Sequence, residues 1–143
     1  MAEHLHHVHV FAQDLERTVN WWQRMLGARV FFDGQFGGAR NVFLKVGTGR
    51  LHLYDQPARD SGRGPVHHVG IRTDDLAGLV ARMQAQGQAF RSPIREFGSW
   101  RYIMCEAPDQ VLLELFEIES SRMPAGAAAF FADETDGPRQ PTA

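Results

Sequence analysis

The sequence predicts an α+β fold made of two tandem copies of one βαβββ module, because the chain carries an internal repeat. The segment HVHVFAQDL at residues 7–15 returns as HVGIRTDDL at residues 68–76. The segment LHLY at residues 51–54 returns as LELF at residues 113–116, at an offset one residue longer than that of the first pair. Each copy of such a repeat is one supersecondary unit that cannot bury its apolar face alone. We therefore expect two half-domains that share one core.

The first copy is predicted to hold one helix and four strands. Asp14 is a good N-cap residue, apolar residues recur at helical spacing over Leu15–Leu26, and Gly27 ends the helix. A Gly-rich turn (DGQFGG) and a GTG turn separate the later strands. The strands are rich in β-branched and aromatic residues and span residues 5–12, 29–32, 40–46 and 50–55.

The second copy repeats this order. Asp74 or Asp75 is expected to cap a helix that runs through Leu76 and Met83 and ends at Gly87. The tripeptide Pro-Asp-Gln is expected to form the hairpin turn between the last two strands. The four predicted strands span residues 66–72, 89–94, 100–106 and 111–118.

Composition shifts divide the chain into modules, a linker and a tail. The expected divisions are a first module at residues 4–56, a linker at 57–64, a second module at 65–118 and a C-terminal tail at 119–143. Within the tail, a short helix at residues 125–131 is expected to dock through Phe130 and Phe131, and residues 133–143 read as a frayed end.

The composition excludes several classes of protein. The chain has 143 residues, an apolar share of 43%, and a formal net charge of −2 without a basic stripe, which argues against nucleic-acid binding. No run of about 20 apolar residues occurs, so no membrane span is expected. The only cysteine is Cys105, which we expect to be a small buried residue; the lack of a second cysteine and of a signal peptide favours a cytoplasmic protein.

The repeat places four potential metal ligands at equivalent positions, namely His7, His52, His68 and Glu114. Three imidazoles and one carboxylate suit a transition-metal ion better than Mg²⁺ or Ca²⁺, which prefer oxygen ligands. We therefore expect each site to hold one divalent metal ion, which is Fe, Ni, Co, Zn or Mn. Glu114 or His52 could also serve as the catalytic base.

Four further residues are predicted to line a substrate pocket. His9 lies two residues after His7 in the same predicted strand and so shares its face. Trp100, Tyr102 and Met104 alternate along one face of a later strand, which turns Arg101 to the opposite face. A shift of one residue in register would instead make Arg101 an anion-binding residue. The neighbouring histidines at positions 6 and 67 are expected at the surface or an interface.

The repeated βαβββ pattern, with HHV…DL opening each half and APDQVLLELFE closing the second, resembles the glyoxalase, bleomycin-resistance and extradiol-dioxygenase superfamily, also called vicinal oxygen chelate proteins. The resemblance covers about residues 5–118. It implies that curved mixed sheets form a half-open barrel around a metal, which binds substrate through two adjacent oxygens. The ligands of that superfamily lie on the first and last strands of each module. They match His7, His52, His68 and Glu114 here.

Two positions depart from the pattern of the superfamily. His52 stands where its glyoxalases usually carry Glu or Gln, which leaves the reaction class open. The final turn reads Ala-Pro-Asp-Gln in place of Asp-Pro-Asp-Gly, which is expected to change only the turn.

The resemblance supports several functions. The favoured one is lyase or isomerase chemistry through a metal-bound enediolate on a small oxygen-chelating substrate. One alternative is an extradiol-type dioxygenase that binds Fe(II) through His7, His68 and Glu114. Another is a drug-sequestering protein of the bleomycin-resistance type, which the intact ligand set argues against. Fosfomycin-resistance chemistry ranks below these because no loop for potassium or a phosphonate is recognisable.

A homodimer is the expectation for this superfamily. Its metal site could form within one chain or across two. In the second case His7 and His52 come from one subunit, and His68 and Glu114 come from the other.

Overall fold

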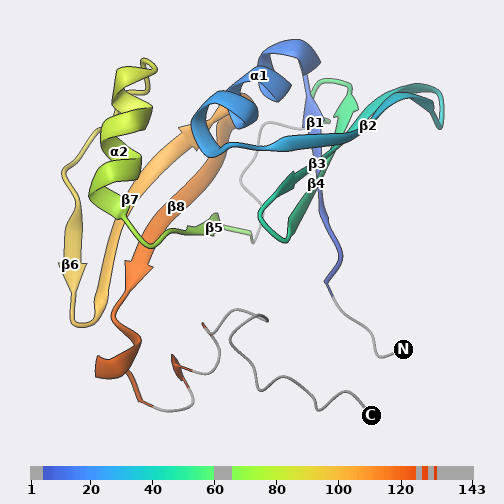
Figure 1. Ribbon diagram of the computed structural model, residues 1–143. Helices are drawn as coiled ribbons and strands as arrows, with labels where there is room; N and C mark the ends of the chain where they lie inside the picture. The colour runs from blue at the N-terminus through green and yellow to red at the C-terminus, as the bar shows by residue number, and fades with distance from the viewer. Residues whose placement is uncertain (1–4, 60–65, 125–126, 129–130, 132–143) are drawn as a thin grey trace, which may run out of the picture.

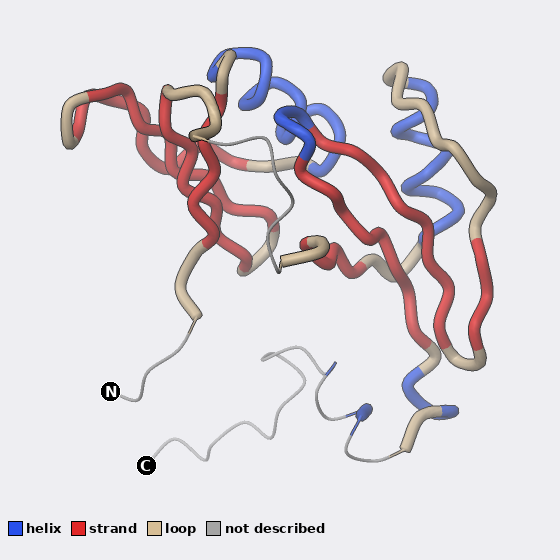
Figure 2. The backbone as a smooth tube through the Cα atoms, turned by 180° about the vertical axis from the view of Figure 1, so that it is seen from behind, coloured by secondary structure: helices blue, strands red, loops and turns tan. Residues whose placement is uncertain are grey.

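The computed structural model describes residues 5–59, 66–124, 127–128 and 131. It confirms the α+β class and the repeated modules. The described residues form two four-stranded sheets, and one α-helix of 10 to 12 residues accompanies each sheet (Figure 1). The view from behind shows that the sheets are curved and that neither closes into a barrel (Figure 2). No described helix has the length and hydropathy that a membrane span requires.

The first module forms a mixed sheet in the order β1-β4-β3-β2. Strand β1 is parallel to β4, whereas β4, β3 and β2 are antiparallel neighbours. The parallel pair requires a crossover connection, which the first helix begins. The elements are β1 (Val8–Ala12), α1 (Leu15–Leu26), β2 (Arg29–Phe36), β3 (Ala39–Val46) and β4 (Gly49–Asp55).

The second module repeats this topology in the order β5-β8-β7-β6. Its elements are β5 (Val69–Arg72), α2 (Leu76–Ala85), β6 (Arg95–Phe97), β7 (Trp100–Ala107), the 3₁₀ turn η1 (Pro108–Gln110), β8 (Val111–Ile118) and the 3₁₀ turn η2 (Ser120–Arg122). His52 of β4 pairs with His9 of β1, and Glu114 of β8 pairs with Gly70 of β5. The two last-strand candidates therefore hold equivalent places in the two sheets.

Both helices begin and end where their capping residues predict. The Asp14 carboxylate accepts a hydrogen bond from the backbone N–H of Arg17 at 3.1 Å, and Gly27 ends α1 in the left-handed conformation with φ +65°. Asp75, rather than Asp74, caps α2. The buried residues of α2 are Leu76, Leu79, Val80 and Met83, as its helical spacing predicts.

The core lies between each helix and one face of its sheet. Along β4, and along β3 from Val42 onward to Lys45, buried side chains alternate with half-buried ones, and Leu44 and Leu53 are almost fully buried. The same alternation in β8 buries Leu113 and Leu115 and leaves Glu114 between them half-buried. The period of two residues thus assigns the polar candidates to the face that the helices do not cover.

One predicted strand was wrong. Residues 89–94 form a loop with a bend, and β6 covers only Arg95–Phe97. Pro93 interrupts the predicted run, because proline cannot donate a hydrogen bond to a sheet and restricts the residue before it. The strand predicted over residues 29–32 continues instead to Phe36, since Gly37 and Gly38, both with positive φ, suffice for the hairpin turn.

Other boundaries moved because strands end where their partners end. Strand β1 begins at Val8 opposite Leu51, and β5 begins at Val69 opposite Leu113. His7 and His68 therefore lie just before β1 and β5, not within them. In the tail, residues 127–128 and 131 are helical; the rest of the predicted helix, Phe130 and the predicted frayed end lie outside the described residues, as does part of the predicted linker.

Candidate metal centre

His68, just before β5, and Glu114, in the neighbouring strand β8, lie side by side in the second module. The Nε2 atom of His68 lies 3.1 Å from the Oε2 atom of Glu114. Two ligands bound at about 2.1–2.2 Å from one ion, at right angles, lie about 3.0 Å apart. The Glu114 side chain is 15% exposed and that of His68 is 34% exposed, and both residues line a pocket. The pair therefore fits two adjacent coordination positions of a divalent ion.

Each candidate first-strand ligand contacts the histidine before it. The Nδ1 atoms of His67 and His68 lie 2.8 Å apart, and those of His6 and His7 lie 3.1 Å apart. A contact at Nδ1 leaves Nε2 as the free nitrogen of the ligand and fixes its ring orientation. His6 and His67 are exposed, which agrees with the predicted surface or interface position, and each also contacts a candidate ligand. The signal that could have found them is the HH doublet, which occurs in both copies of the repeat.

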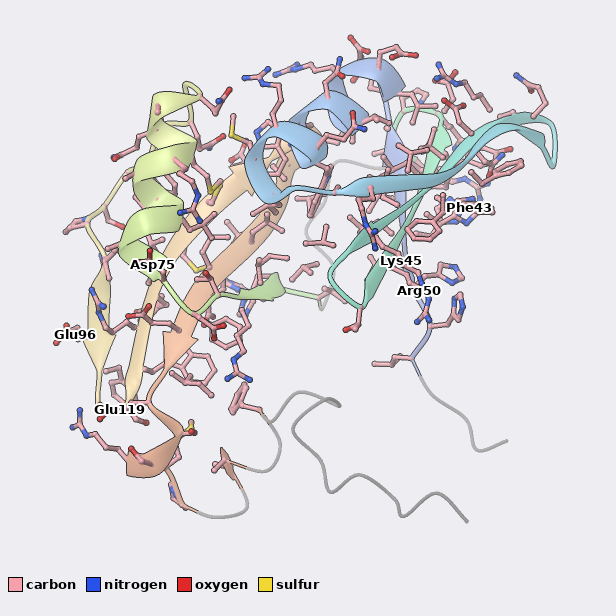
Figure 3. All side chains as sticks on the ribbon, in the orientation of Figure 1. Phe43, Lys45, Arg50, Asp75, Glu96 and Glu119 are labelled. Atoms are coloured by element: carbon pink, nitrogen blue, oxygen red, sulfur yellow. The ribbon has the colours of Figure 1, made fainter. Side chains whose placement is uncertain are left out.

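In the first module the candidates gather around His52. Its ring centroid lies 4.3 Å from that of His9 and 5.7 Å from that of His7. Phe43, from the neighbouring strand β3, packs edge-to-face against His52 at 4.6 Å and is labelled in Figure 3. Tyr54 lies 5.6 Å from His9. This half of the candidate site therefore combines imidazoles with aromatic walls.

The protonation of His52 is fixed by a buried amide. The Nε2 atom of His52 lies 2.5 Å from Oδ1 of Asn41, which is fully buried. The Nδ2 atom of Asn41 donates to the carbonyl of Ala39 at 2.9 Å, which orients the amide. Because Oδ1 can only accept, Nε2 of His52 carries the proton and Nδ1 keeps its lone pair. Burial, with smaller contributions from the charges of His9 and His7, lowers the pKa of His52 below its ordinary value.

The four sequence candidates form two pairs within one chain. His7 lies with His52 on the first sheet, and His68 lies with Glu114 on the second. In the described part of the chain, no three His, Cys, Asp or Glu residues are placed to hold one metal ion together.

A pocket of about 410 Å³ opens beside the second pair. Tyr102 and Met104 line it, whereas Trp100 donates its indole N–H to Glu114 at 2.8 Å. Arg101 lies on the other face, where it contacts Glu117 and Glu96. The pocket is lined by His67, His68, Ser92, Arg95, Tyr102, Ile103, Met104 and Glu114.

Arg95, from the segment 95–99 that was expected to shape the pocket, is a lining residue that was not among the predicted site residues. Its backbone pairs with Tyr102, so the two side chains share a face of the sheet. Among the residues that the structure describes, its guanidinium has no hydrogen-bond or ion-pair partner. An unpaired cation at the edge of a pocket attracts an anionic group.

The model of the Glyoxalase/Bleomycin resistance protein/Dioxygenase superfamily matches residues 4–115. The chain belongs to this superfamily. No curated protein matches it in sequence. One structure that it resembles is the fosfomycin resistance protein FosX of Listeria monocytogenes, solved in complex with Mn(II) and a sulfate ion.

Solved structures of the superfamily share the fold over nearly their whole length. The glyoxalase family protein from Enterococcus faecalis is 26% identical with a TM-score of 0.68, and the match covers 80% of this chain and 98% of that one. The FosX protein of Mesorhizobium loti is 25% identical with a TM-score of 0.64, covering 80% and 91%. The Listeria FosX protein is 16% identical with a TM-score of 0.66, covering 85% and 98%, and shows similarity of fold alone.

Proposed function

We propose that this chain is a divalent-metal-dependent enzyme of the glyoxalase superfamily that acts on a small substrate with two adjacent oxygen atoms. The favoured reaction is of the lyase or isomerase type, with proton transfer at a carbon beside a carbonyl. The observation that carries the proposal is the 3.1 Å separation of His68 Nε2 and Glu114 Oε2, which suits two ligands of one ion. The bound ion would stabilise negative charge on the substrate oxygens as a Lewis acid.

We propose His7, His68 and Glu114 as the metal ligands, with His7 supplied by a second copy of the chain. The separation of the candidates into two pairs supports a site shared across a homodimer. Apolar side chains exposed on β1 and β2, including Val8 and Phe31, support burial of this region in an interface.

We assign His52 the role of catalytic base. Its Nε2–H is held by Asn41, so Nδ1 is the nitrogen available to accept a proton. Its lowered pKa keeps the ring neutral at pH 7, as a base requires. Glu114 is the alternative base if it leaves the metal during the reaction.

The substrate pocket is proposed to include His9, Tyr102 and Met104, with Trp100 behind Glu114. Arg95 adds a cation to the pocket, so the preferred substrates carry a carboxylate or another anionic group. Arg95→Gln is then expected to raise KM about tenfold for anionic substrates and to leave neutral analogues unaffected. Arg91→Gln, on the exposed loop before β6, is the matched control.

One observation favours a second function. With His52 held by Asn41 and assigned as the base, the remaining candidate ligands are two histidines and one carboxylate. This is the ligand set of non-haem Fe(II) oxygenases, including the extradiol type. The drug-sequestering and fosfomycin-type functions are retained as outcomes of the test.

The test begins with untagged protein purified under argon without chelators. We expect one divalent ion per site by elemental analysis, lost in Glu114→Gln and kept in Glu106→Gln, the same charge change on the adjacent strand. Deuterium exchange beside a carbonyl without O₂ would support the lyase or isomerase. O₂ uptake with catechols would instead support the dioxygenase. Turnover of fosfomycin would instead support the fosfomycin-resistance activity. Failure to bind any divalent ion would overturn the proposal and favour a drug-binding protein.

A further inference from the structure

The two oxygens of Glu114 have different partners. Oε2 faces Nε2 of His68 at 3.1 Å, whereas Oε1 accepts a hydrogen bond from Nε1 of Trp100 at 2.8 Å. Met104, not Trp100, lies directly opposite Glu114 in the sheet. The long indole therefore reaches along the sheet from four residues away to meet Oε1. An indole N–H can only donate, so it does not compete with a metal ion as a ligand.

Packing holds the indole in this position. The ring of Phe116 stacks on Trp100 with centroids 4.6 Å apart and an interplanar angle of 13°. The ring of Phe131 packs edge-to-face against the indole of Trp100, with the ring centroids 4.8 Å apart. The carbonyl of Phe131 accepts a hydrogen bond from the Arg72 guanidinium. Strand β8 ends at Ile118, just before Glu119, which is labelled in Figure 3, and Phe131 contacts Trp100 from the part of the chain that follows.

We propose that Trp100 is a positioning residue that restricts Glu114 to binding the metal through Oε2 alone, and that Phe131 holds the indole in place. This proposal rests on the role of Glu114 as a ligand proposed above. A carboxylate that binds a metal through both oxygens also needs a lone pair of Oε1, and the indole N–H competes for that oxygen because it already holds one of its two lone pairs. A hydrogen bond to a charged acceptor is stronger than a neutral one, so the restraint is substantial.

The restraint has a consequence for the substrate. A carboxylate bound through one oxygen occupies one coordination position, whereas a chelating carboxylate occupies two. Trp100 therefore keeps a position available for the second oxygen of a chelating substrate. Hydrogen-bond partners of metal ligands typically affect metal affinity by about 10–100-fold when removed.

Trp21 provides a matched control elsewhere in the chain. Its Nε1 donates to Oε1 of Gln88 at 3.0 Å, outside the candidate site. Trp21→Phe and Trp100→Phe thus remove the same kind of indole hydrogen bond while keeping an aromatic ring. Only the second is expected to alter metal binding.

The experiment uses the full-length protein and Mn²⁺ as the probe. Isothermal titration calorimetry measures the Kd, and metal-minus-apo infrared difference spectra measure the separation of the two carboxylate stretching bands. We expect Trp100→Phe to weaken Mn²⁺ binding about tenfold or more. We also expect its band separation to narrow, because Glu114 becomes free to bind through both oxygens. Phe131→Leu should shift both quantities in the same direction by less, and Trp21→Phe should change neither.

The failures of the two proposals are distinguishable. If Glu114→Gln loses Mn²⁺ binding but Trp100→Phe leaves the Kd and the band separation unchanged, the positioning role is overturned and the metal site stands. If Glu114→Gln retains binding, the proposed ligand set is wrong. If the metal-free Trp100→Phe protein unfolds at a much lower temperature, the test relies on Phe131→Leu instead. An unchanged Kd for Mn²⁺ and an unchanged band separation in Phe131→Leu would then overturn the proposal.

Discussion

Asp109, in the turn between β7 and β8, accepts a hydrogen bond at 3.2 Å from the hydroxyl of Thr18 in α1. Its other carboxylate oxygen accepts from the backbone N–H of Gln13 at 3.1 Å. Thr18 is almost fully buried, so its hydroxyl requires a partner within the protein. One residue of the second module thus binds both the start of α1 and the loop between β1 and α1.

We expect loss of this carboxylate to lower the free energy of unfolding. Asp109 has φ +64°, so Asp109→Gly removes the side chain without imposing strain on the turn. Leaving the buried Thr18 hydroxyl unpaired should cost about 1–3 kcal/mol. Chemical denaturation measures the change, with Asp74→Gly, an exposed position just before the N-cap of α2, as the control. Equal stability of the two variants would mean that the contact between the modules contributes nothing.

A metal site shared across a dimer predicts complementation between two inactive variants. His7→Ala and Glu114→Gln should each lose metal when expressed alone. Co-expression should restore about one site per four chains, because half of the dimers are mixed and each mixed dimer holds one intact site. Metal analysis of the co-purified protein measures the recovery. Absence of recovery in dimers proved to be mixed would place each site within a single chain.

His52 should make stability depend on pH. Its folded-state pKa lies below the ordinary value of 6.5, so the unfolded chain binds more protons once the pH falls through that value. Stability is therefore lost as the pH drops from 6.5 towards the lowered pKa, and the penalty is absent above 6.5. Thermal unfolding between pH 7.5 and 5 should show a smaller decrease for His52→Gln than for the wild type. Parallel curves for the two proteins would contradict this assignment.

Cys105 should be unreactive in the folded protein. It is 3% exposed, and burial together with the nearby Glu106 carboxylate raises the pKa of its thiol to about 11. At pH 8 almost no thiolate is present, and reagents cannot reach the sulfur. We expect a disulfide reagent to label the thiol only after denaturant is added. Rapid labelling of the native protein would show that β7 opens readily.

The fold followed from sequence features that act locally or repeat. Asp14 and Gly27 mark the ends of α1 because capping depends on a few adjacent residues. The repeat predicted that His52 and Glu114 occupy equivalent places, and the strand registers confirm this. The strand predicted over residues 89–94 was wrong. The limits of an edge strand depend on its hydrogen-bond pairing with the neighbouring strand, and Pro93 cannot donate a hydrogen bond to a sheet.

The hydrogen-bond partners of the site residues could not be predicted from the sequence. Asn41 meets His52 because β3 and β4 pair side by side, and Trp100 meets Glu114 through a long side chain that crosses between strands. No spacing along the chain encodes such contacts. Arg95 entered the pocket only when β6 was placed against β7.

By itself the sequence determined the α+β class, the two modules, both helix starts and the four ligand candidates, because periodicity, capping and internal repetition are properties of neighbouring residues. The tertiary structure alone decided that His68 and Glu114 lie 3.1 Å apart, that His7 stays with His52, and that an indole holds the carboxylate. Those relationships depend on strand pairing and side-chain packing between segments distant in the chain, which only the folded protein brings together.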